Sequence, residues 1–175
     1  MIALRPFTKQ DYTQLMDWVP TEHVLRQWAG PSFTYPLTSQ QLDEYVNERK
    51  EDRWIFTVLS VQSGLSIGHV SLKHNVKHDS VRIGRVLVGE SAERGKGYGQ
   101  AIVRAVTDFS FNELQAHRVE LGVFDFNNAA RRAYTNVGFH EDGVLRDYRK
   151  MGREYWSLVE MSILKSEWLE QDEKD

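Results

Sequence analysis

The sequence predicts a mixed α/β protein in which helices pack against a β-sheet. Three observations support this fold class. Segments with helical and strand periodicity follow one another in the order αα, βββ, α, β, α, ββ along the chain. A glycine-rich turn separates an apolar strand from an amphipathic helix near the middle. The composition, 41% apolar and 27% charged, is that of an ordinary globular protein.

Length and composition exclude several classes. The 175 residues suit a single domain, 1–175, and the chain has no internal repeat or low-complexity linker. It has no cysteine, so disulfides, a thiolate nucleophile and a Cys-ligated metal are excluded. No membrane span or signal peptide is recognisable, which predicts a cytoplasmic protein without a membrane partner. A formal charge of −3 argues against a nucleic-acid partner.

The N-terminal third is predicted to contain a strand and two helices. Residues 2–7 alternate weakly and predict a short strand, and residues 11–18 predict a short helix. Residues 20–38 hold three of the four prolines and are predicted to be irregular. Residues 39–50 predict a helix, because a serine cap precedes apolar side chains at helical spacing.

The middle of the chain is predicted to be rich in strands. Residues 54–61, 66–72 and 80–89 are strand-like, and Ser63-Gly64 is a plausible hairpin turn between the first two. After the glycine turn, apolar side chains between positions 101 and 109 fall on one helical face.

The C-terminal third predicts a strand, a helix and a hairpin. Residues 118–124 form the strand, and residues 127–138 form the helix, with Asn127 as its N-cap and Gly138 just past its end. Two further strands, 143–150 and 155–164, are joined at Met151-Gly152.

The glycine turn, Arg94 to Gly99, reads RGKGYG and predicts an anion site. Glycines let a ligand approach the backbone, and free amides at a helix start favour phosphate. A P-loop is excluded because no Lys-Ser/Thr pair follows a glycine, and the glycine spacing is wrong for a dinucleotide fold. The turn does match the pattern [R/Q]-x-x-G-x-[G/A]. From these six residues alone, a plain glycine-rich loop remains an alternative.

A second motif follows about thirty residues later. Asn127, Ala130, Tyr134, Gly138 and Phe139 form the frame N-x-x-A-x-x-x-Y-x-x-x-G-F. With both motifs and the C-terminal hairpin, the chain resembles the GNAT superfamily of acetyl-CoA-dependent N-acetyltransferases over nearly its whole length. The opening residues resemble most the branch of ribosomal-protein N-terminal alanine acetyltransferases.

The resemblance implies a mostly antiparallel twisted sheet whose central strand pair is splayed, with flanking helices. It implies acetyl-CoA as acetyl donor and a primary amine, of a protein N-terminus or a small molecule, as acceptor. The glycine turn would wrap the pyrophosphate and the preceding strand would hydrogen-bond the pantetheine. Asn127 would contact the pantetheine or cap its helix. The implied cofactor-binding residues are Val86, Leu87, Val88, Arg94, Gly95, Lys96, Gly97, Tyr98, Gly99, Asn127, Ala130 and Tyr134.

Tyr134 is the predicted general acid for the leaving thiolate, since an unperturbed phenol stays protonated at neutral pH. The base is open. Relatives often carry Glu-Ile-Gly where this chain has Arg82-Ile83-Gly84, so that carboxylate is missing. Glu90 and Glu120 are candidates acting through water, and no side-chain base is needed if the amine arrives neutral. His69 is a further candidate, or a structural histidine.

The predicted acceptor-binding residues are mostly aromatic: Trp28, Phe33, Tyr35, His69 and Arg82. Core packing is the alternative for the large rings. His74 and His78 lie in a predicted turn without a third ligand, so no metal site is expected.

The sequence therefore predicts an N-acetyltransferase that works by direct attack of the amine in a ternary complex with acetyl-CoA. The alternative is a CoA-binding sensor or interaction module of the same fold without turnover. Monomer and homodimer both remain open.

Overall fold

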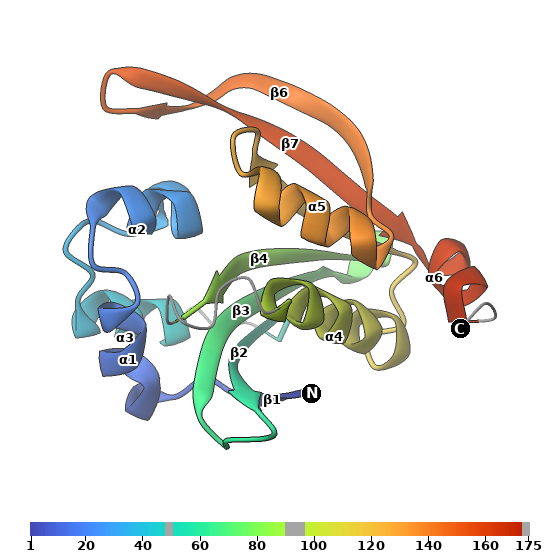
Figure 1. Ribbon diagram of the computed structural model, residues 1–175, viewed down its shortest axis with the longest axis horizontal. Coiled ribbons are helices and arrows are strands. Elements are labelled where there is room, and N and C mark those ends of the chain that lie inside the picture. Colours follow the sequence, from blue (N-terminus) through green and yellow to red (C-terminus); the bar gives the residue numbers. More distant parts are fainter. Residues whose placement is uncertain (48–50, 90–96, 173–175) are drawn as a thin grey trace.

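The computed structural model describes residues 1–47, 51–89 and 97–172. Its core is one seven-stranded sheet with the order β1-β2-β3-β4-β5-β7-β6 (Figure 1). The strands are β1 (Ile2–Pro6), β2 (Arg53–Ser60), β3 (Ser66–Asn75), β4 (Ser80–Val88), β5 (Arg118–Phe124), β6 (His140–Met151) and β7 (Glu154–Leu164). The α-helices are α1 (Tyr12–Asp17), α2 (Glu22–Ala29), α3 (Ser39–Asn47), α4 (Tyr98–Asn112), α5 (Asn128–Val137) and α6 (Lys165–Asp172).

All neighbouring strands are antiparallel except the central pair β4–β5, which is parallel. This pair is joined only from Ser80–Arg118 to Ile83–Leu121. Beyond that point β4 continues beside β3 to Val88, and β5 continues beside β7 to Phe124. The two strands therefore diverge, and the predicted splayed central pair is confirmed.

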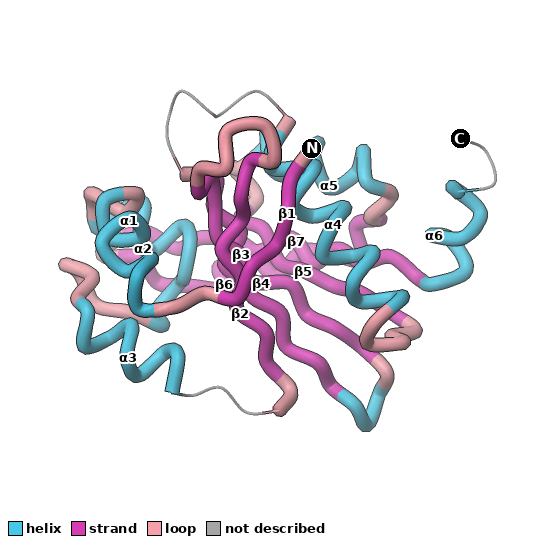
Figure 2. Tube along the Cα trace, turned by 90° about the horizontal axis from the view of Figure 1, so that it is seen from below, coloured by secondary structure: helices cyan, strands magenta, loops and turns pink. Residues whose placement is uncertain are grey.

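Helices cover both faces of the sheet (Figure 2). On one face α4 and α5 bury a large core, in which Ile102, Val106 and Val137 are fully enclosed. On the other face the N-terminal helices α1–α3 cover a second core that includes Leu87 of β4. Alternation along β4 sends Leu87 to one face and its neighbours Val86 and Val88 to the other, so the diverging end of β4 contributes to both layers.

Two helices lie where the sequence analysis expected none. Residues 20–38 are not wholly irregular, because α2 forms within them: the Thr21 hydroxyl accepts a hydrogen bond from the Val24 amide at 3.2 Å, and Leu25 and Trp28 are buried at helical spacing. The prolines misled the prediction because they flank this helix rather than interrupt it. The C-terminal helix α6 was not predicted, since Trp168, which packs against Phe111, is the one buried side chain among its described residues.

The remaining elements follow the predicted ranges closely. The predicted caps of α5 are confirmed, because Asn127 Oδ1 accepts a hydrogen bond from the Ala130 amide at 3.2 Å and Gly138 is left-handed with φ of 108°. The predicted hairpin joint is also found, since β6 ends at Met151 and Gly152 is left-handed. None of the helices within the described ranges is both long and apolar enough to cross a membrane.

Candidate active site

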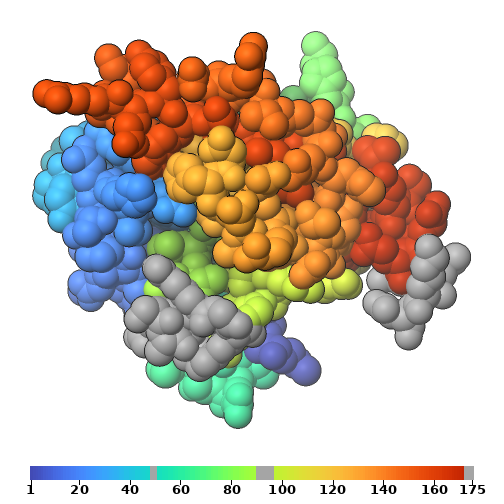
Figure 3. Space-filling model, turned by 45° about the horizontal axis from the view of Figure 1, so that its top comes forward, coloured from blue at the N-terminus to red at the C-terminus, as the bar shows by residue number. Residues whose placement is uncertain are grey.

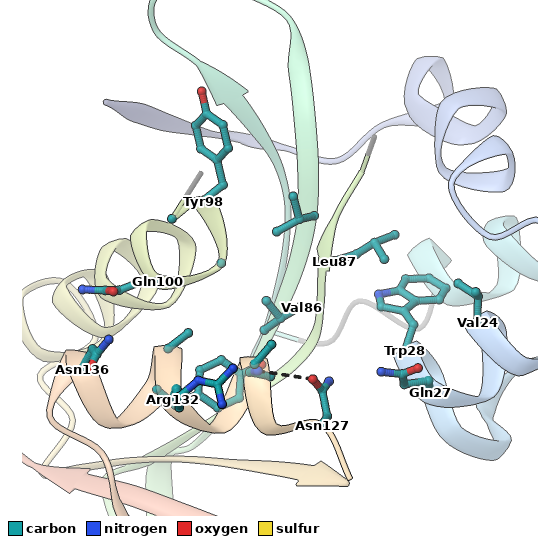
Figure 4. Close-up of a pocket in the computed structure, with 17 residues that line it drawn as sticks. Val24, Gln27, Trp28, Val86, Leu87, Tyr98, Gln100, Asn127, Arg132 and Asn136 are labelled. Atoms are coloured by element: carbon teal, nitrogen blue, oxygen red, sulfur yellow. Dashed lines mark hydrogen bonds between the residues drawn. The ribbon is translucent and has the colours of Figure 1, made fainter. Parts of the chain in front are cut away.

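A cleft of about 510 Å³ lies between α2, the diverging end of β4, the first turn of α4 and most of the length of α5. Figure 4 shows Val86 and Leu87 in its middle, Gln27 and Trp28 on the α2 side, and Asn127 on the α5 side. In the space-filling view the N-terminal helices and the α5 region flank a hollow in which β4 is visible (Figure 3). The residues that line the cleft are Val24, Gln27, Trp28, Val86, Leu87, Val88, Gly97, Tyr98, Gly99, Gln100, Asn127, Ala129, Ala130, Arg132, Ala133, Tyr134 and Asn136.

The glycine turn supplies the N-terminus of α4. Gly97 is the N-cap of this helix with a φ of 81°, which only glycine adopts without strain, and no side chain of the described residues caps the helix. The first intrahelical bond runs from the Ala101 amide to the Gly97 carbonyl at 3.0 Å. The amides of residues 98–100 thus have no intrahelical acceptor, and all three residues line the cleft. Arg94, Gly95 and Lys96 lie outside the described residues.

The cleft is open beside the end of β4 because β5 diverges from β4 there. Val86 to Val88 lie beyond the last β4–β5 pair, so their edge toward β5 has no strand partner. An extended amide-bearing ligand can add to such an edge in the way a further strand does. The structure thus brings the predicted strand residues and the glycine turn to one cleft.

Between the diverging strands lies a smaller space of about 90 Å³, here called the gap. It shares five residues with the cleft, so the two spaces adjoin: Gln27, Trp28, Val86, Asn127 and Tyr134. The gap is completed by Ile83, Gly84, Arg85, Leu121, Gly122, Val123, Phe124 and Leu158.

Tyr134 projects from α5 to the boundary between cleft and gap. Its side chain is 8% exposed, and burial raises the pKa of its phenol to about 12. The phenol is therefore a hydrogen-bond donor throughout the physiological pH range. Its position between the two spaces is the geometry that the predicted acid role requires.

Trp28 lies at the same boundary on the opposite side. Its indole nitrogen donates a hydrogen bond to the Arg85 carbonyl at 2.9 Å, and its ring stacks on Phe33 with centroids 5.7 Å apart. Trp28 is 8% exposed, so it serves both as core and as wall of the cleft. The core interpretation of this ring is confirmed, and its role in acceptor binding stays a prediction.

None of the remaining predicted acceptor residues, Phe33, Tyr35, His69 and Arg82, lines the cleft. Tyr35 is exposed and donates a hydrogen bond to the Pro20 carbonyl at 2.9 Å. His69 is only 1% exposed and lies in an aromatic enclosure, with Phe7 at 4.8 Å and Trp28 at 5.5 Å between ring centroids. The His69 ring packs edge-on against the Trp28 ring, which agrees with the structural alternative for this histidine.

The burial of His69 predicts a pH-dependent stability. Burial and the nearby charge of Arg85 lower the pKa of His69 to about 3, whereas an unfolded histidine titrates near ~6.5. Between these values the unfolded chain binds the proton and the folded one does not, so stability falls as pH falls. We expect His69 to contribute a loss of roughly 1.4 kcal/mol in free energy of unfolding for each pH unit below about 6.

This slope is measured by urea unfolding at several pH values. His69→Gln is expected to flatten the dependence between about pH 6 and 4 relative to the wild type. His78→Gln, at an exposed position on the β3–β4 turn, is the matched control and should retain the wild-type slope. An identical slope in His69→Gln and the wild type would contradict the assignment.

Arg82 and Glu120 form an ion pair with each other. Arg82 pairs with Glu160 through two nitrogens at 2.8 and 2.9 Å and contacts Glu120 at 3.3 Å. Glu120 is also held by Arg118 at 3.3 Å. Neither Arg82 nor Glu120 lines the cleft or the gap. The structure therefore places them in an ion-pair network across the sheet, and Glu90 lies outside the described residues.

Several lining residues were missed by sequence reasoning. Val24 and Gln27 belong to α2, whose Thr21 cap and helical spacing were the signal that could have revealed it. Arg132 and Asn136 lie on the predicted helix α5, but no motif marked them. Within the described ranges there is no cluster of His, Asp and Glu suited to a metal ion.

Comparisons with known proteins agree with this geometry. The family model described as an acetyltransferase (GNAT) domain matches residues 2–140. A probable N-acetyltransferase, YjcK of Bacillus subtilis, is 32% identical over 67% of this chain and 66% of its own length. The spermidine N(1)-acetyltransferase of Vibrio cholerae is 25% identical over 98% of both chains.

A crystal structure of the Vibrio cholerae spermidine N-acetyltransferase with CoA and spermine superposes with a TM-score of 0.83. It is 25% identical in sequence, and the match covers 96% of this chain and 98% of that one. The finer resemblance to ribosomal-protein acetyltransferases remains a prediction. Together the matched model, the sheet with its splayed central pair and the cleft show that this chain belongs to the GNAT family of acetyltransferases, enzymes that transfer an acetyl group from acetyl-CoA to an amine.

Proposed function

We propose that this protein acetylates the primary amine of a small molecule by direct attack in a ternary complex with acetyl-CoA. The proposal rests on the gap beside Tyr134, which lies between the diverging strands β4 and β5 and adjoins the cleft. The gap is small, about 90 Å³, and so suits a slender amine-bearing group. Relatives with small amine acceptors support this choice: one is named for spermidine and another for aminoglycosides.

The cleft fits acetyl-CoA in three respects. The amides of residues 98–100, which have no intrahelical acceptor, suit a pyrophosphate. The edge of β4 beyond its last pair with β5 suits the amide-bearing pantetheine arm, and Tyr134 lies where that arm would end. The bound donor supplies a thioester, whose carbonyl carbon is the electrophile. On this proposal the backbone amides of the diverging β4 end also polarise that carbonyl.

Tyr134 is proposed to donate its phenolic proton to the sulfur as the C–S bond breaks and the C–N bond forms. The amine nitrogen loses its proton to water, and a proton from water restores the Tyr134 phenol, so that amide and thiol are the products. A phenol with pKa of about 12 is a weak acid, so it protonates a thiolate only when the sulfur is shielded from water. Burial of Tyr134 beside the cleft supports that condition.

No acidic or histidine side chain is among the described residues that line the gap. This supports the version of the mechanism without a side-chain base, in which the amine arrives neutral. A neutral amine is also easier to transfer from water into an enclosed site than an ammonium group.

A screen of amines with acetyl-CoA tests the proposal. Amino acids, their amides, polyamines and peptides with free N-termini are incubated with the protein, and CoA release and acetylated products are measured by thiol assay and mass spectrometry. We expect amine-dependent CoA release, with small amines preferred to peptides. Thermal stabilisation by acetyl-CoA without turnover of any amine would instead favour the CoA-binding module.

A further inference from the structure

Arg85 occupies an irregular position in β4, next to the gap. His69 pairs with Leu87 and Ser71 with Gly84, so Val70 faces two residues, Arg85 and Val86. Arg85 has a positive φ of 52°, which is uncommon for a residue with a side chain. This bulge turns the Arg85 side chain toward the layer of α2 and α3, and the Trp28 indole holds its carbonyl.

The Arg85 guanidinium is held by aromatic rings rather than by acids. It lies 4.7 Å from the centroid of Tyr45 and 5.5 Å from that of Phe33. Among the described residues no carboxylate forms an ion pair with it, and its Nε atom is buried without a hydrogen-bond partner. Arg82, three positions earlier on the same strand, is in contrast paired with two glutamates.

The environment of Arg85 is a second hollow of about 670 Å³, here called the Arg85 hollow. Its lining residues are Ser32, Phe33, Thr34, Thr38, Gln40, Gln41, Glu44, Tyr45, Arg53 and Arg85. Arg85 lines the gap as well, so it connects the hollow to the place where the amine is expected. The charged residues that line this hollow are Arg53, Arg85 and Glu44, and the Glu44 side chain is exposed on α3.

From this arrangement we infer that the acceptor amine also carries a carboxylate, which binds to the guanidinium of Arg85. The inference rests on the proposed function and names its substrate class. A planar guanidinium matches a carboxylate in shape and charge, and the aromatic rings hold it in one orientation. A polycation would instead bring like charge to Arg85. The amine of the acceptor lies in the gap, and its carboxylate lies at the end of the gap next to Arg85. An acceptor with these two groups is a small amino acid.

The experiment compares matched acceptors. The value of kcat/KM is measured by thiol release for linear amino acids of increasing length, for the corresponding amino amides and for spermidine. In the wild type we expect each productive amino acid to exceed its amide by about 10- to 100-fold, the range for a charge-assisted hydrogen bond. Arg85→Gln is expected to remove this preference, so that kcat/KM for each amino acid falls to that for its amide, while the KM for acetyl-CoA stays close to wild type.

Two further variants separate the inference from a structural effect. Arg85→Lys keeps the charge and is expected to retain part of the preference. Arg104→Gln removes another half-buried arginine that stacks on a ring, that of Trp168 at 5.4 Å, away from the hollow, and should leave the preference unchanged. Turnover of amides or spermidine with no preference for carboxylates would overturn this inference but not the proposed function. Failure of every carboxylate-bearing amine to react, or an unchanged preference in Arg85→Gln, would also overturn it.

Discussion

Replacement of Tyr134 by phenylalanine is expected to lower kcat by about 100-fold or more, because general acids typically contribute that much. The change removes one hydroxyl from a side chain that is 8% exposed and fills the same space otherwise. Acetyl-CoA binding depends on backbone amides and the β4 edge, so its KM should change little. Steady-state kinetics with a saturating amine measure both values.

The matched control is Tyr155→Phe, which removes the same hydroxyl from an exposed side chain on β7. It should retain wild-type kcat. The pKa of about 12 for Tyr134 adds a second expectation: wild-type kcat should not fall between about pH 7 and 10 through loss of the phenolic proton. Unchanged turnover in Tyr134→Phe would rule out the acid role.

A bulky side chain at Gly99 is expected to raise the KM for acetyl-CoA by at least about ten-fold, equivalent to about 1.4 kcal/mol. Among the described residues, a Cβ atom added at Gly99 would meet Val88 Cγ2 at 3.8 Å and nothing nearer, so a larger side chain extends into the cleft between α4 and β4. In Gly99→Phe the ring would occupy space that the donor needs. The Tm should not fall, because no described residue packs tightly against this position.

Gly99→Ala is the control for backbone effects. It adds one methyl group, at ordinary van der Waals distance from Val88, within the first turn of α4, and alanine is favourable by about 0.5–1 kcal/mol relative to glycine in a helix interior. Its KM for acetyl-CoA should stay near that of the wild type. If Gly99→Phe also had the wild-type KM, acetyl-CoA would not pass between Gly99 and Val88, and the cleft would be wrongly assigned.

Local signals in the sequence predicted most elements of this fold. The clearest example is α5, whose asparagine cap and C-terminal glycine are both local features, and both are found. Helix α2 shows the limit: its cap and spacing were present, but the surrounding prolines dominated the interpretation. Helix α6 gave little signal because Trp168 is the one buried side chain among its described residues.

The sequence by itself determined the family, the glycine turn and the Asn127–Tyr134 frame, because these depend on residue types at fixed spacing along one chain. Tertiary structure decided what each side chain faces. Arg82 and Arg85 lie three positions apart on one strand, yet two glutamates pair with Arg82, while a bulge turns Arg85 toward the rings of Phe33 and Tyr45, where no carboxylate of the described residues pairs with it. The partners come from β5, β7, α3 and the segment after α2. Such contacts between distant segments, and the divergence of β4 from β5, arise only when the sheet assembles.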